Sequence, residues 1–207
     1  MRTFIPRLSA FGSVLLLVLA LGFAAGCGEQ GPEPAYKGTD ITGADFGRDL
    51  QLNDHDGKPR SLADFRGKVV VLFFGYTHCP DVCPTTLSDM AQALKLLTPE
   101  QARRVQVLFV TVDPERDTPE MLKGFVTYFH PSFLGLHGTP EAVARAAREF
   151  KVTYRRHTEP GATDYLIDHT AGSYVLDGRW RLRLYLPYAH PPADIAHDLA
   201  LLMQSGG

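Results

Sequence analysis

The chain has 207 residues, of which 44% are hydrophobic and 21% charged, and its formal net charge at pH 7 is −2. A chain of this length is long enough for one domain with a packed core. The weakly acidic balance leaves no basic surface of the kind that binds nucleic acid, so we expect no nucleic-acid partner. Three cysteines are too few for a fold that depends on disulfides for its stability.

The first 26 residues have the pattern of an export signal. Arg2 and Arg7 precede an apolar stretch over residues 8–23, and small residues then lead directly to Cys27. This ending resembles a bacterial lipoprotein box, in which Cys27 is the lipidated first residue. The alternative is an uncleaved membrane anchor, because the apolar run is close to the ~18 residues of a spanning helix. Both interpretations predict a membrane-tethered domain outside the cytoplasm, on the periplasmic side.

The composition changes again after the signal segment. Residues 27–45 are rich in Gly, Pro, Glu and Thr and predict a flexible tether. The folded domain is expected over residues 46–207. At its start, the Asp-Gly pair at 56–57 lies between short apolar segments and predicts an N-terminal β-hairpin.

Alternating strands and helices follow the hairpin. Apolar runs predict strands over residues 69–74, 105–112, 133–136, 173–176 and 181–186. Helices are expected over residues 85–97, 118–129, 139–150 and 192–203, the second and third of them opening with Thr-Pro-Glu. Repeated βα units followed by an antiparallel pair and a helix predict an α/β, thioredoxin-like fold, with a central mixed sheet flanked by helices.

Residues 78–84 read HCPDVCP and place Cys79 and Cys83 four residues apart, directly after the first buried strand. If the helix begins within this motif, both sulfurs lie on the same face of it. Such a pair can hold a soft metal ion or form a reversible disulfide. As a structural staple it would close only a very small loop and add little stability. The helix N-terminus should also favour the thiolate of Cys79 and lower its pKa.

A third ligand has to come from elsewhere in the chain, and the candidate is His169 in the segment DYLIDHT over residues 164–170. In a thioredoxin-like fold this edge faces the first strand–helix junction. Two thiolates and one imidazole suit copper as both Cu(I) and Cu(II). The alternative for His169 is an ordinary hydrogen-bonded histidine. His78 is expected to face solvent, and the other six histidines show no metal-binding spacing.

Three segments in this order resemble the Sco/SenC family: GYTHCPDVCP at 75–84, TVDPERDTP at 111–119 and DYLIDHT at 164–170. The similarity extends from about Asp45 onward. It implies a membrane-anchored copper chaperone with a thioredoxin-like fold, with copper ligands at Cys79, Cys83 and His169. Members of the family help to assemble the copper A centre in subunit II of cytochrome c oxidase, and some also reduce that subunit's cysteines. The implied partners are therefore subunit II, a copper donor protein and a thiol reductant.

Two other functions stay open at this point. One is a dedicated thiol–disulfide oxidoreductase that uses the redox-active pair Cys79 and Cys83 without stored copper. The other is a peroxidase, although Thr77 lies two residues before Cys79, where a peroxiredoxin should have threonine three residues before. Asp113 and Asp117 are expected to end a strand and to begin a helix, with a supporting role beside the metal as the alternative.

Overall fold

The computed structural model describes residues 35–158, 160–161 and 164–205. The predicted signal segment, the lipidation site Cys27 and the first part of the tether lie outside these residues and stay predictions. The folded unit begins at Tyr36, earlier than the boundary that we predicted at residue 46. The reason is that this segment contributes a strand, β1, to the sheet. No helix of the described part is long and apolar enough to cross a membrane.

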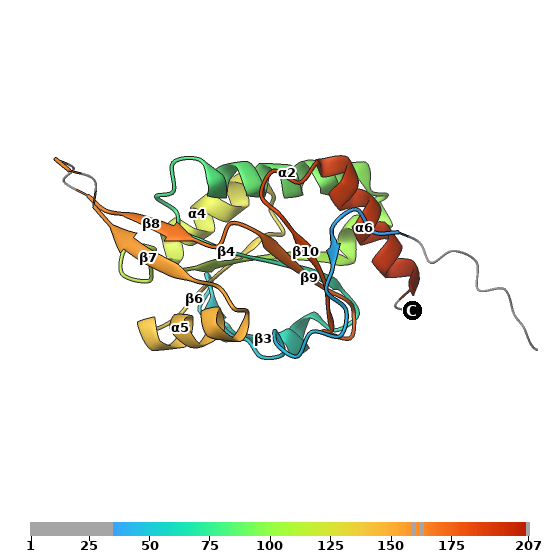
Figure 1. The fold of residues 1–207 in the computed structure, drawn as a ribbon, viewed down its shortest axis with the longest axis horizontal. Coiled ribbons are helices and arrows are strands. Elements are labelled where there is room, and N and C mark those ends of the chain that lie inside the picture. Colours follow the sequence, from blue (N-terminus) through green and yellow to red (C-terminus); the bar gives the residue numbers. More distant parts are fainter. Residues whose placement is uncertain (1–34, 159, 162–163, 206–207) are drawn as a thin grey trace, which may run out of the picture. The chain divides into compact units, whose positions relative to one another are not determined.

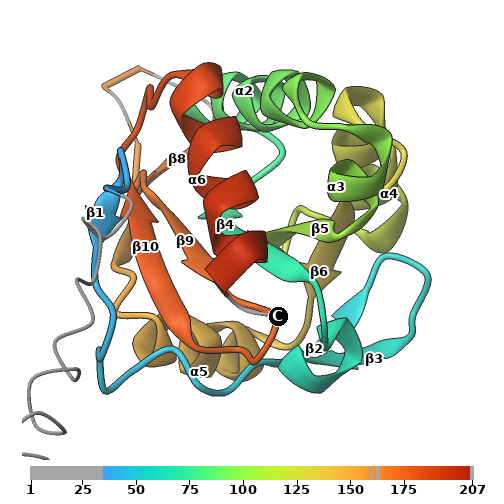
Figure 2. The same ribbon diagram turned by 90° about the vertical axis from the view of Figure 1, so that its right-hand side faces the viewer.

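An eight-stranded mixed sheet forms the centre of the domain, in the order β1-β10-β9-β4-β5-β6-β2-β3 (Figures 1 and 2). β5 pairs in parallel with β4 and β6, and the remaining pairs are antiparallel. The strands are β1 (Thr39–Asp40), β2 (Gln51–Asp54), β3 (Pro59–Ser61), β4 (Val69–Gly75), β5 (Val105–Thr111), β6 (Leu134–His137), β9 (Ser173–Leu176) and β10 (Leu182–Leu186). β4 and β5 are buried along their whole length, which explains their continuous apolar sequences.

Helices cover both faces of this sheet, with α2, α4 and α6 on one side and α5 on the other (Figure 1). The helices are α2 (Val82–Leu96), α3 (Pro99–Arg103), α4 (Pro119–Phe129), α5 (Pro140–Glu149), α6 (Pro192–Ser205) and the 3-10 helix η1 (Leu62–Phe65). As predicted, Thr118 and Thr139 cap α4 and α5, each accepting a hydrogen bond from a backbone N–H of the first turn. The predicted fold of a mixed sheet flanked by helices is confirmed, and β2 and β3 form the N-terminal hairpin.

A second, two-stranded sheet projects beyond the main one (Figure 1). It consists of β7 (Tyr154–His157) and β8 (Leu166–His169), paired antiparallel. We did not predict this hairpin, nor β1 and α3. The sequence of β7 is YRRH, and its residues are exposed or half-buried. A strand without an apolar face leaves no alternation for a sequence pattern to detect.

Candidate metal centre

The two cysteines lie where β4 gives way to α2. The helix begins at Val82, inside the motif, and not at residue 85 as predicted. Cys83 is therefore in its first turn and fully buried, whereas Cys79 is half-buried in the preceding loop. The backbone N–H of Cys83 donates a hydrogen bond to the Sγ atom of Cys79 over 3.4 Å. Both residues are free thiols in this structure.

His169 is the last residue of β8, so the projecting hairpin brings the imidazole to the cysteines. Its Nε2 atom lies 3.5 Å from the Sγ atom of Cys83. Its Nδ1 atom lies 3.0 Å from the carbonyl oxygen of Thr170. Because a carbonyl can only accept, Nδ1 must carry the proton in this bond, and Nε2 presents its lone pair to the sulfurs. This tautomer is the one that a metal-binding histidine needs.

The three predicted ligands thus come together. The ligand atoms of Cys79, Cys83 and His169 all lie within 4.8 Å of one another. Two sulfurs and one imidazole nitrogen are a soft donor set, which suits copper and also zinc. His78 is not part of this group; its ring is hydrogen-bonded to Thr77 and lies 3.8 Å from a carboxylate oxygen of Asp117.

The two thiols differ strongly in acidity. A hydrogen bond from the Cys83 side chain lowers the pKa of Cys79 to about 4 in spite of its partial burial. Burial raises the pKa of Cys83, and the negative charge on Cys79 raises it further. At neutral pH the pair therefore holds one thiolate, on the accessible sulfur, and one thiol, on the buried sulfur.

Aromatic rings and a glycine shape the space around the ligands. The rings of Phe73 and Tyr76 meet the His169 ring edge-on, with centroids 5.8 and 6.0 Å away. A Cβ atom at Gly75 would lie 2.6 Å from the Sγ atom of Cys83, which no real contact allows. The absence of a side chain at this position is therefore what makes room for the buried sulfur.

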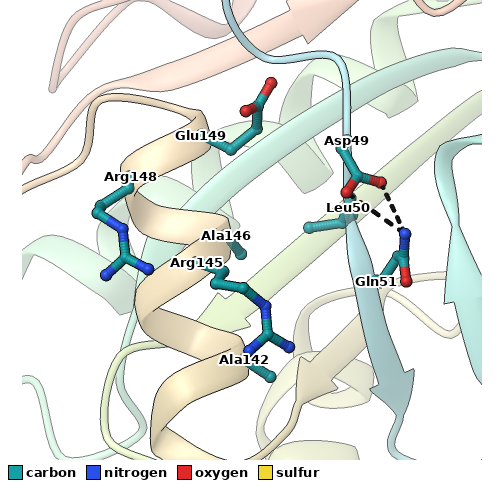
Figure 3. Close-up of a pocket in the computed structure, with 8 residues that line it drawn as sticks. All are labelled: Asp49, Leu50, Gln51, Ala142, Arg145, Ala146, Arg148 and Glu149. Atoms are coloured by element: carbon teal, nitrogen blue, oxygen red, sulfur yellow. Dashed lines mark hydrogen bonds between the residues drawn. The ribbon is translucent and has the colours of Figure 1, made fainter.

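A pocket of about 330 Å³ opens beside the group and gives access to it; Cys79 and His169 are among its lining residues. A cavity of about 420 Å³ lies elsewhere, between the start of β2 and α5 (Figure 3). Its lining side chains include Asp49, Gln51 and Arg145, with Gln51 hydrogen-bonded to Asp49. It contains neither thiol nor imidazole, so its chemistry is unrelated to that of the cysteine group.

Sequence reasoning left the roles of Asp113 and Asp117 open. The structure shows that both side chains are fully buried. Asp117 is hydrogen-bonded to the cysteine segment and Asp113 to the hairpin that carries His169. The only sequence signal for these contacts was the segment TVDPERDTP itself.

Comparison with known proteins gives consistent results. Residues 38–204 match the SCO1/SenC family. The mouse protein described as SCO2 homolog, mitochondrial, is 44% identical over 130 residues, or 62% of this chain and 51% of the mouse protein. The chain thus spans about half the length of the mammalian mitochondrial relatives that it matches.

Two solved structures extend this comparison to three dimensions. Apo Sco1 from Thermus thermophilus is 43% identical, with a TM-score of 0.71, covering 83% of this chain and 98% of that one. Copper-bound ScoI from Bradyrhizobium japonicum is 36% identical, with a TM-score of 0.68, covering 75% and 98%. Because the family match spans nearly the whole folded domain, the chain belongs to the SCO1/SenC family.

Proposed function

We propose that this protein is a copper chaperone whose Cys79, Cys83 and His169 hold copper as cargo for a partner protein. The observation that carries the proposal is the convergence of two sulfurs and one imidazole nitrogen within 4.8 Å. It is supported by a family relative of 36% identity whose structure contains copper. Sco proteins take part in the assembly of cytochrome c oxidase, and the partner proposed here is the copper A centre of its subunit II.

The arrangement of the three ligands suits transfer better than storage. The half-buried Cys79 is a thiolate at neutral pH, so it is the ligand that an incoming or departing ion meets first. Cys83 is fully buried behind it and must lose its proton before it can bind. His169 is carried by a separate hairpin and lines the pocket beside the group. Stepwise exchange of soft ligands at such a site keeps the ion bound throughout.

The proposal is tested by copper binding to the purified domain under reducing conditions. We expect one equivalent of Cu(I), measured by competition with a chromophoric chelator, and its loss in Cys79→Ser and Cys83→Ser. His169→Ala should weaken binding of Cu(II) most. His130→Ala is the matched control, because His130 is hydrogen-bonded to Ser132 and is not part of the group. Full retention of copper in the three site variants would exclude this site.

Delivery is a separate step and needs its own measurement. The copper-loaded domain is incubated with the apo form of cytochrome c oxidase subunit II, and the metal content of each protein is measured after separation. We expect copper to move to subunit II. Copper that stays on the loaded domain, with subunit II competent to take up free copper, would contradict delivery.

A second candidate function is reduction of a partner's disulfide by the same pair. The observation in its favour is the low pKa of Cys79, because an accessible thiolate beside a second thiol is what thiol–disulfide exchange requires. The test uses metal-free domain and oxidised subunit II. Thiols gained by subunit II and lost by the domain are counted, and Cys83→Ser should leave a mixed disulfide through Cys79. Absence of both products would exclude this activity.

The proposal also includes a lipid anchor at Cys27 and a periplasmic location. The basis is the order of positive, apolar and small residues before this cysteine. Metabolic labelling with a fatty acid should mark the full chain, and Cys27→Ala should abolish the label. A labelled Cys27→Ala protein would contradict lipidation at this residue.

A further inference from the structure

One loop carries two buried carboxylates, one bonded to the cysteine segment and one to the residue before β8. The loop joins β5 to α4 over residues 112–118, and both Asp113 and Asp117 have fully buried side chains. Burying a carboxylate costs free energy unless the group is hydrogen-bonded. The hydrogen-bond partners of each acid therefore indicate its role. Neither residue belongs to the group of three ligands.

Asp117 holds the segment that carries the cysteines. Its carboxylate accepts hydrogen bonds from the backbone N–H of Thr77, at 3.1 and 3.2 Å, and from the Thr77 hydroxyl, at 2.6 Å. It also accepts one from the hydroxyl of Thr111 at the end of β5, at 2.6 Å. Thr77 lies two residues before Cys79, so these contacts attach the cysteine loop to the sheet.

Asp113 holds the hairpin that carries His169. Its carboxylate accepts a hydrogen bond from the hydroxyl of Tyr165, at 2.8 Å, and one from Nε of Arg116. Nη2 of Arg156, in β7, lies 3.5 Å from the same carboxylate. Asp113 therefore contacts β7 through Arg156 and the residue directly before β8 through Tyr165.

The ring of Tyr165 is held in place by contacts of its own, besides the hydrogen bond of its hydroxyl. The guanidinium groups of Arg116 and Arg156 lie over it, 3.6 and 4.5 Å from the ring centroid. Arg116 also donates to the carbonyl oxygen of Tyr165, at 3.0 Å, and to Asp164, at 2.7 Å. Arg116 is also bonded to Asp113. Its side chain therefore connects the loop to the ring and backbone of Tyr165 and to the carboxylate of Asp164.

The hairpin depends on such contacts for its position. An isolated two-stranded hairpin is marginally stable in water. Within the described residues, β7 and β8 form a sheet of their own and pair with no strand of the main sheet. In β8, Ile167 is buried and donates its backbone N–H to the hydroxyl of Tyr76. The loop over residues 112–118 supplies the charged contacts that attach the hairpin to the rest of the domain.

We propose that Asp113 and Asp117 are positioning residues that together set the distance between the two halves of the metal site. Asp117 fixes the cysteine segment and Asp113 fixes the His169 hairpin. The short loop between the two acids holds the segment and the hairpin at a constant distance from each other. The inference rests on the metal-binding part of the proposed function and not on delivery.

The first test separates the two halves. Asp113→Asn and Tyr165→Phe should increase amide hydrogen exchange in β8 of the metal-free protein and weaken Cu(II) binding about tenfold or more. The thiolate-to-copper absorption bands should shift in both. Tyr165→Phe is the gentler variant, because it removes only the hydroxyl that bonds to Asp113. Asp113→Asn should leave the midpoint potential of the Cys79–Cys83 disulfide unchanged, whereas Asp117→Asn should shift it.

The second test is a double-mutant cycle with His169. If Asp113 acts by placing the imidazole, then Asp113→Asn should have no further effect on copper affinity in a His169→Ala background. A general loss of stability would instead lower the affinity by the same factor in both backgrounds. An effect that persists without His169 would therefore overturn the inference.

Asp177→Asn is the matched control. Asp177 is as buried as Asp113 and is also paired with arginines, Arg181 and Arg183. Asp177 directly follows β9 and lies near the start of β4. The cysteines come after the end of β4, so the control residue is at the opposite end of this strand. This variant should lose stability but keep the copper affinity, absorption bands and disulfide potential of the wild type.

Wild-type copper binding together with wild-type exchange in β8 of folded Asp113→Asn and Tyr165→Phe would overturn the inference. Failure of the proposed function would look different, because the wild-type domain itself would not bind copper. Hydrogen exchange and the disulfide potential need no metal, so they decide the inference in that case as well.

Discussion

The Sγ atom of Cys83 lies 3.5 Å from the Nε2 atom of His169, although the two residues are separated by 86 positions in the chain. The first atom is held in the opening turn of α2 and the second at the end of β8. The candidate metal site of Cys79, Cys83 and His169 therefore forms only when α2 and the β7–β8 hairpin are both in place.

The acidity of Cys79 should be visible in its reactivity. Its pKa of about 4 lies below the ordinary thiol value, so the reactive thiolate predominates at every pH above about 4. The alkylation rate of Cys79 by iodoacetamide in the metal-free protein should be nearly constant from about pH 6 to 8. A tenfold rise in rate per pH unit up to about pH 8.5 would contradict the assignment.

Copper binding should release about one proton at neutral pH. Cys79 is already a thiolate and Nδ1 of His169 keeps its proton in the bond to Thr170, so the released proton comes from the thiol of Cys83, whose pKa is raised by burial. Affinity should accordingly increase with pH across the neutral range. Calorimetry in buffers of different ionisation enthalpy measures the number directly. Release of two protons would show that Cys79 is protonated as well.

Gly75→Ala should damage the site and the core together. The added methyl group would overlap the Sγ atom of Cys83, at 2.6 Å, and the ring of Phe109, at 2.8 Å. We expect a loss of roughly 1–3 kcal/mol in the free energy of unfolding, measured with urea, and weaker copper binding. Gly124→Ala in α4 is the control, because nothing lies within 4 Å of its added methyl group. There the free energy of unfolding should rise by about 0.5–1 kcal/mol.

Asp177→Asn should remove an acid-sensitive contribution to stability. Burial acts to raise the pKa of Asp177, but hydrogen bonds from Arg181 and from backbone N–H groups outweigh it and lower the pKa below 3.8. The stabilisation is therefore complete above the unfolded value and is lost as the pH falls through the folded pKa. At pH 7 the free energy of unfolding of the variant should be roughly 1–3 kcal/mol lower than that of the wild type. The difference should narrow below about pH 4, and a constant difference would contradict this account.

Much of the fold could be predicted because its signals are local. β4 is a continuous apolar run, the Asp-Gly turn joins β2 to β3, and threonine caps mark the starts of α4 and α5. Each of these features depends on residues within a few positions of one another. β1 and the β7–β8 sheet carry no such signal. They are short or polar strands that form by pairing with distant segments.

The candidate site divides in the same way. The sequence by itself determined that two thiols stand four residues apart beside the start of a helix. The shared helical face that this spacing predicts did not form, because Cys79 lies in the loop before α2. The structure alone decided that the helix begins at Val82, that His169 ends β8 beside Cys83, and that Asp113 and Asp117 attach to the two halves. These contacts join segments up to 86 residues apart, and their distances follow from how the elements pack and not from any local pattern.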